Sequence, residues 1–132
     1  MGKLSKVKTD SKKEIEGIWE DYEEGIRLKI ARMGNPLYDE EIYRLSKPVL
    51  KRSREIPADE LERISKQAVA KYILVDWENI EDDDGNEIPY SSEKALEYFN
   101  DHDLRGFYRD IILIANDRNR FRREFIEEAV KN

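Results

Sequence analysis

The sequence predicts a mainly α fold, with four to five helices around one core and a short N-terminal β-hairpin packed against their side. Two patterns support this prediction. From residue 36 onward, apolar residues recur at steps of three and four, the spacing of one face of a helix. Before that, Ile26, Leu28 and Ile30 alternate with charged residues, which is the pattern of a half-buried strand. The length of 132 residues fits one domain, and the clustering of apolar residues indicates that it folds although 41% of its residues are charged.

Residues 1–13 form a segment that we expect to be a flexible basic tail. It carries five lysines against the single acid Asp10, and beyond the initiating methionine its only larger apolar residues are Leu4 and Val7. Such a segment buries too little apolar surface to offset the entropy lost on ordering. Residues 14–132 are therefore expected to form a single, mainly helical domain.

Two short runs, residues 16–22 and 26–33, predict the two strands of the hairpin. The residues between them, Glu23, Glu24 and Gly25, fit a three-residue loop in which the glycine is free to adopt a positive φ. A hairpin alone is only marginally stable in water. We therefore expect this one to pack on the helices that follow.

Prolines and a capping residue delimit two long helices. Asn35 can cap a helix that has Pro36 at its first position, where a proline loses no hydrogen bond. Pro48 is expected to kink or end this helix, although the residues after it could continue it. Pro57 opens the next helix. We expect its apolar face to consist of Leu61, Ile64, Ala68, Tyr72 and Val75.

Two further helical segments follow an acidic loop at residues 78–90. Ser91 or Ser92 can cap a short helix, and a longer apolar stripe begins at Leu104. Residues 116–119 interrupt this stripe. The pattern then resumes with Phe121, Phe125, Ile126 and Ala129.

The residues indicate no enzyme, and we predict no catalytic, metal-binding or cofactor-binding residue. The run Asp82–Asp84 before Gly85 resembles part of a calcium-binding EF-hand loop, but Ile80 and Ser91 stand where that loop needs its first aspartate and its last glutamate. We therefore interpret these aspartates as turn formers. The single histidine, His102, lies in a polar break between helices, where it is best explained by its helix-cap surroundings.

Composition also bears on the compartment. The chain has no cysteine, which suits a reducing environment and excludes disulfides and thiolate metal sites. The basic N-terminus is not followed by the apolar region of a secretory signal. The longest strongly apolar run, residues 111–115, is far shorter than the roughly 20 residues that a membrane-spanning helix needs. We expect a cytoplasmic protein that does not enter a membrane.

Charge disfavours nucleic acid as the partner, although one alternative stays open. The formal net charge is −6, from 24 basic and 30 acidic residues, so the overall field repels phosphate. Residues 118–123 form the most concentrated basic patch, but Arg120 and Arg123 have Glu124 and Glu127 four residues on and would be partly neutralised in a helix. The alternative is a small nucleic-acid-binding regulator that uses this patch and the lysine tail.

The middle of the chain is strongly acidic. Residues 76–103 contain eleven acidic residues and one basic residue, Lys94, for a formal charge of −10. Such a region could steer a basic partner toward the protein. It could equally be a solvated loop that keeps the protein soluble, and the sequence leaves both interpretations open.

Residues 71–80, Lys-Tyr-Ile-Leu-Val-Asp-Trp-Glu-Asn-Ile, are followed at residues 84–91 by Asp-Gly-Asn-Glu-Ile-Pro-Tyr-Ser. This arrangement resembles the tail assembly chaperones of long-tailed bacteriophages, in which a helix ends in a tryptophan segment and an acidic loop with a D-G-x-x-I-P-Y-S pattern follows. Residues 25–36 also resemble the hairpin and helix start of that family. The motif residues are predicted to hold the loop as framework first and to contact a partner second: Trp77, Gly85, Ile88, Pro89 and Tyr90.

The resemblance implies a function in virion assembly. Such a chaperone binds the tape measure protein in the host cytoplasm and keeps it soluble during tail tube assembly. The tail tube protein and further copies of the chain itself are additional candidate partners. A structural subunit of the tail or of head completion is a further alternative.

Overall fold

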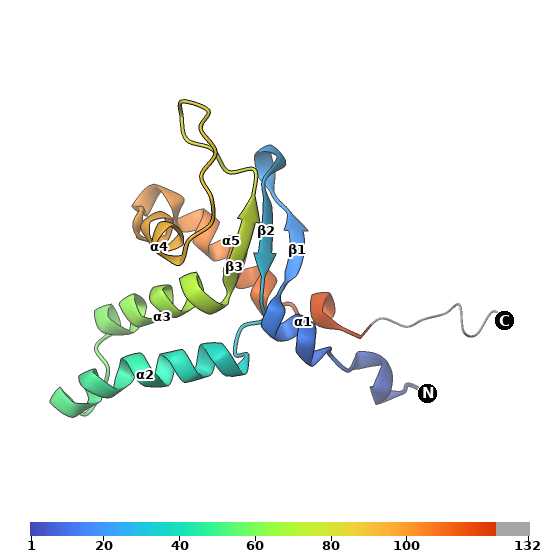
Figure 1. Cartoon of the computed structure of the whole chain (residues 1–132). Helices are drawn as coiled ribbons and strands as arrows, with labels where there is room; N and C mark the ends of the chain where they lie inside the picture. Colours follow the sequence, from blue (N-terminus) through green and yellow to red (C-terminus); the bar gives the residue numbers. More distant parts are fainter. Residues whose placement is uncertain (124–132) are drawn as a thin grey trace.

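The structure, a computed structural model, describes residues 1–123, and this part of the chain folds into five α-helices and a three-stranded antiparallel sheet (Figure 1). The predicted fold class is confirmed: the protein is mainly α with a short N-terminal hairpin. The α-helices are α1 (Ser11–Glu16), α2 (Pro36–Arg52), α3 (Ala58–Tyr72), α4 (Ser92–Asn100) and α5 (Arg105–Asn116). The strands are β1 (Ile18–Asp21), β2 (Arg27–Ile30) and β3 (Leu74–Glu78). Short 3-10 turns lie at η1 (Leu4–Val7), η2 (Glu23–Gly25), η3 (His102–Leu104) and η4 (Arg118–Phe121).

The predicted hairpin is present as strands β1 and β2. Ile18 lies opposite Ile30 in an antiparallel register, and the η2 turn joins the strands with Gly25 at a φ of 74°. Leu28 and Ile30 of β2 are fully buried on the core face of the sheet. On its other face, the guanidinium of Arg27 stacks on the ring of Trp19 at 5.0 Å. The alternation of apolar and charged residues thus sorts the two faces of β2 as predicted.

A third strand replaces the end that we predicted for the second long helix. Helix α3 ends at Tyr72, and the chain then pairs as β3 with β2, so that Trp77 lies opposite Leu28. The prediction that the helical face extends to Val75 is therefore wrong. A short run of buried apolar residues suits a strand as well as a helix, and here the exposed edge of β2 supplies hydrogen-bonding partners that only a strand can use.

The predicted helix starts are confirmed by their caps. The side-chain oxygen of Asn35 accepts hydrogen bonds from the backbone amides of Leu37 at 3.0 Å and Tyr38 at 3.1 Å. Ser91 caps α4 by accepting a hydrogen bond from the amide of Lys94 at 3.0 Å. Pro48 does not end α2, which continues to Arg52. Because Pro48 is on the exposed side of the helix, water can solvate the carbonyl that its ring leaves unpaired.

The main core lies between the sheet and helices α3, α4 and α5. Its largest fully buried side chains include Leu28, Ile30, Ile73, Leu74, Phe99 and Ile111. Helices α2 and α3 pack side by side as an arm that extends away from this core (Figure 1). Leu61, predicted to be on the buried face of α3, is 46% exposed because it lies in the first turn of that helix, at the far end of the arm.

The two ends of the described chain lie together at the end of the sheet opposite the loop at residues 79–90 (Figure 1). The amide of Asp10 donates to the carbonyl of Phe121 at 2.7 Å, and Thr9 pairs with Arg122 in an isolated β-bridge. Phe121 is fully buried, as its place in the apolar pattern predicted. Mobility of residues 1–13 in solution stays a prediction, and the apolar residues predicted after Phe121, namely Phe125, Ile126 and Ala129, lie outside the described residues.

Within residues 1–123, no helix combines the length and the apolar composition that a membrane span requires.

Candidate protein-binding site

The acidic loop at residues 79–90 is a narrow hairpin that projects from the end of β3 (Figure 1). Its two limbs pair through the amide of Ile88, which donates to the carbonyl of Ile80 at 2.8 Å. At the tip, a carboxylate oxygen of Asp82 accepts hydrogen bonds from the amides of Asp84 and Asn86 at 3.0 and 2.9 Å. Gly85 follows with a φ of 84°. Asp82 therefore forms the turn, as the sequence predicted, and these hydrogen bonds lower the pKa of its carboxyl group.

Two aromatic side chains anchor the base of this loop. The indole Nε1 of Trp77 donates to the carbonyl of Ile88 at 2.8 Å, and the Trp77 ring meets Tyr90 edge to face at a centroid distance of 5.0 Å. The hydroxyl of Tyr90 lies 2.7 Å from the carbonyls of both Ala70 and Leu74. Burial, followed by the nearby carboxylate of Asp76, raises the pKa of Tyr90 to about 12, so its hydroxyl stays protonated as a donor near neutral pH.

The motif residues predicted from the sequence thus divide into two groups. Trp77, only 5% exposed, is brought together with Ile88 and Tyr90, and these three join the loop to the core. Gly85 and Pro89 stay at the surface. This geometry gives the first group a framework role, while contact of any of the five residues with a partner stays a prediction.

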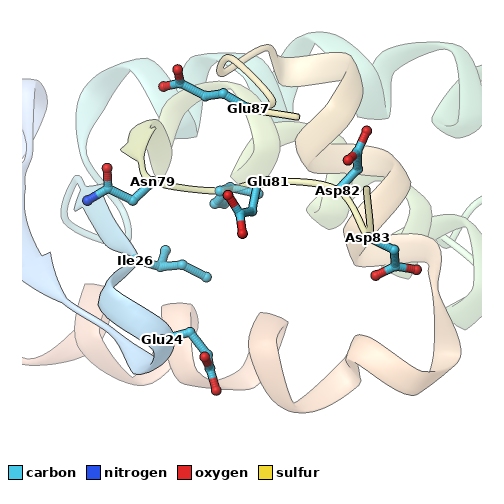
Figure 2. A pocket seen from close by; sticks show the side chains of 8 residues that line it. Glu24, Ile26, Asn79, Glu81, Asp82, Asp83 and Glu87 are labelled. Carbon is cyan, nitrogen blue, oxygen red and sulfur yellow. The ribbon is translucent and has the colours of Figure 1, made fainter. Parts of the chain in front are cut away.

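The opposite side of the loop borders an open hollow of about 680 Å³ that it shares with the η2 turn. Figure 2 shows Glu24 and Ile26 of the hairpin on one side, Asp82 and Asp83 of the loop on the other, and Glu81 between them. The side-chain amide of Asn79 donates to the carbonyl of Gly25 at 3.0 Å and so joins the loop to the turn. Two segments that are about 55 residues apart in sequence therefore form one surface.

A second hollow, of about 460 Å³, continues this surface toward α5. It shares three lining residues with the first hollow, Ile26, Ile80 and Glu81. Its remaining lining residues come from the segment after β1 and the start of η2, from α4, from η3 and from α5: Tyr22, Glu23, Tyr98, Asp103, Leu104, Gly106, Phe107 and Asp110. We call the two hollows together the acidic groove.

Sequence reasoning did not find the aromatic part of the acidic groove. Tyr22 meets Phe107 edge to face at 5.6 Å, and the Tyr22 hydroxyl donates to a carboxylate oxygen of Asp110 at 2.6 Å. Burial and the adjacent Asp110 carboxylate raise the pKa of Tyr22 far above its usual value. The alternation in the first strand places Tyr22 at a strand end, but no local signal could pair it with a carboxylate 88 residues away.

The basic patch at residues 118–123 lies elsewhere, and much of it contacts the protein itself. Arg120 forms ion pairs with Glu20 at 2.5 Å and Asp117 at 3.2 Å, and Nε of Arg123 donates to the carbonyl of Thr9 at 3.2 Å. The chain turns through η4 and is extended at Arg122, so a continuous α-helix does not run through this patch. The predicted partners Glu124 and Glu127 lie outside the described residues.

The acidic side chains do not converge on a point. In the part of the chain that the structure describes, no three His, Cys, Asp or Glu side chains are placed to hold a metal ion together. His102 is exposed at the start of η3, where the carboxylate of the preceding Asp101 caps the turn by accepting from the amide of Asp103 at 3.0 Å. The acids of the groove therefore act as a distributed negative surface.

Comparison with known proteins gives a family for most of the chain. The model of a family described as "YdaY prophage protein" matches residues 33–132. The matched range includes α2 to α5, β3 and the projecting loop, whereas the β1–β2 hairpin precedes it. No curated protein and no solved structure match the chain.

Proposed function

This chain belongs to the YdaY prophage protein family, and we propose that it is a tail assembly chaperone of a bacteriophage. In this role it binds the tape measure protein in the host cytoplasm and keeps it soluble while the tail tube assembles. It acts by binding and performs no catalysis. Family membership supports the phage origin, and the motif at residues 71–91 supports the specific role.

The acidic groove is the observation that carries this proposal. A chaperone must cover apolar surface of a client that has not yet reached its final partners. The groove offers half-buried apolar side chains, among them Ile26 and Phe107, in a depression open to solvent. It borders the loop whose sequence resembles the tail assembly chaperones. A long helical client could lay an apolar stripe into such a depression.

Co-expression with the tape measure protein of the same prophage tests the proposal. We expect the two proteins to co-purify, and we expect the soluble fraction of the tape measure protein to rise severalfold over expression alone. Mass spectrometry of purified virions should find this chain depleted relative to tail tube protein, since a chaperone leaves the assembly.

Three results would contradict the proposal. The tape measure protein could be equally soluble with and without this chain, which would remove the chaperone role. Stoichiometric presence of the chain in virions would indicate a structural subunit. Retention on DNA or RNA that falls steeply with salt, without binding to the tape measure protein, would favour the nucleic-acid-binding alternative.

A further inference from the structure

We propose that the acidic groove selects a client segment in which apolar side chains are flanked by lysine or arginine. The inference rests on the proposed function, because it names the chemistry of the segment that the chaperone would recognise. It follows from three properties of the groove: its apolar floor, the sign of the charge on its rim, and the spread of that charge.

The floor of the groove is aromatic and aliphatic. Tyr22, Tyr98 and Phe107 are half-buried, and the Phe107 ring meets the other two edge to face at centroid distances of 5.6 and 6.4 Å. These contacts hold the rings in place, while the part of each that stays exposed lines the groove. A depression of about 460 Å³ is within the range of roughly 300–1,000 Å³ that binds small ligands, and it can receive side chains of a docked segment.

The rim carries charge of one sign. Among the described residues that line the groove, eight are acidic and none is lysine, arginine or histidine. Glu23, Glu81 and Asp103 border the apolar floor. Asp110 is held beside the floor by the Tyr22 hydroxyl. A segment with basic side chains around its apolar ones would place them next to these carboxylates, and an acidic segment would be repelled.

The spread of the carboxylates favours a peptide over an ion. Within the described 123 residues, no group of three acidic, histidine or cysteine side chains could hold a metal ion. Carboxylates distributed along both hollows suit positive charges that are likewise distributed along a segment. Nucleic acid is disfavoured by the same negative field.

The basic segments at the two ends of the described chain lie away from its own groove. One lysine, Lys94, stands beside the floor, where its Nζ lies 5.6 Å from the centroid of the Tyr98 ring and is paired with the carboxylate of Glu97 at 3.0 Å. Both ends of the described chain, with the lysines of residues 3–13 and the arginines of residues 118–123, lie at the opposite end of the sheet (Figure 1). The groove of an isolated molecule is therefore open to a partner. The lysine segment of a second copy has the right charge to compete with a client for the groove. The experiment below distinguishes such a dimer from binding of a client.

Synthetic peptides titrated into the full chain by calorimetry test the inference. One peptide carries leucines flanked by lysines, a second replaces the leucines with serine, and a third replaces the lysines with glutamate. We expect measurable binding of the first peptide only, with an affinity that falls as salt rises from low to high concentration.

Charge reversal in the protein locates the binding. The double variant Glu81→Lys/Asp103→Lys should weaken binding of the first peptide by about tenfold or more, because it replaces two attractive rim charges with repulsive ones. The matched control Glu40→Lys/Glu55→Lys changes the net charge by the same amount at two exposed positions, one on α2 and one in the segment that follows α2. It should change the affinity by less than about twofold. Circular dichroism of both variants verifies that they fold.

Several results would overturn the inference. One is that the glutamate peptide binds as tightly as the peptide with leucines and lysines. Another is that the control variant weakens binding as much as Glu81→Lys/Asp103→Lys does. A third is that the free protein forms a salt-sensitive dimer that excludes the peptide and that the groove variant abolishes. The failures are separable. Undiminished co-purification of the tape measure protein with Glu81→Lys/Asp103→Lys removes the groove proposal alone. Peptide binding without any capture of tape measure protein removes the proposed function alone.

Discussion

The two sides of the loop at residues 79–90 differ in burial and in hydrogen bonding. On the core side, Trp77 is 5% exposed, and both its indole N–H and the hydroxyl of Tyr90 donate to backbone carbonyls of the protein. On the groove side, Glu81 and Asp83 are exposed and line a hollow. None of the described residues that line this hollow is basic.

In our proposal, this difference lets a single loop separate stability from recognition. Anchored aromatic residues hold the backbone, and the charged residues on the other side are left available for a partner. Substitutions on the core side should therefore lower the free energy of unfolding. Substitutions on the groove side should change binding and leave stability nearly unaffected.

Trp77→Ala should have the largest effect on stability. It removes a buried aromatic side chain, its edge-to-face contact with Tyr90, and the hydrogen bond to Ile88. We expect the free energy of unfolding to fall by about 3–5 kcal/mol, as for other buried aromatic-to-alanine substitutions. Urea denaturation followed by circular dichroism measures it. A loss below about 1 kcal/mol would show that the loop is not anchored by this residue.

Tyr90→Phe should have an intermediate effect. The substitution keeps the ring but leaves the carbonyls of Ala70 and Leu74 without the phenol, so we expect a loss of about 1–2 kcal/mol in the free energy of unfolding. Chemical denaturation at neutral pH measures this loss. Full stability of the variant would contradict the importance of these hydrogen bonds.

The pH dependence of Tyr90 sharpens the same comparison. Its pKa is raised from 10.0 to about 12 in the folded protein, so its contribution is fully present below pH 10 and is lost as the pH rises toward 12. The wild type should therefore lose stability more steeply than Tyr90→Phe over that interval. Parallel slopes for the two proteins would contradict the burial of a protonated phenol at this position.

Glu81→Lys/Asp103→Lys should have the smallest effect on stability. Both side chains are exposed at the rim, and surface substitutions of this kind usually change the free energy of unfolding by no more than about 0.5 kcal/mol. Thermal and urea unfolding of this variant should match those of the wild type. A large loss would mean that the groove side also belongs to the framework, and the distinction between the two sides would fail.

Local patterns predicted the hairpin and the helices α2 to α5, because caps and turns are decided by residues close in sequence, whereas α1 lies on residues expected to belong to the tail and the first strand. Asn35, Ser91 and Gly25 each perform the predicted role in the structure. Strand β3 was missed because its apolar run fits either periodicity, and only its pairing with β2 decides between them.

The candidate site was predictable only in part. The motif around Trp77 indicated an anchored loop, and the charge count indicated an acidic region. The groove itself depends on contacts across the chain, such as Tyr22 with Asp110 and Asn79 with the carbonyl of Gly25. Tertiary folding creates such pairs, and no spacing in the sequence encodes them.

The central claim is that a client binds at the acidic groove. The alternative is binding at exposed apolar side chains of the α2–α3 arm, where Tyr43, Leu50 and Leu61 are 65%, 50% and 46% exposed. Nuclear magnetic resonance of the isotope-labelled chain, titrated with tape measure protein segments, distinguishes the two. We predict the largest amide shifts at groove residues such as Ile26, Glu81 and Phe107. Shifts confined to the arm, with the groove unchanged, would contradict the account.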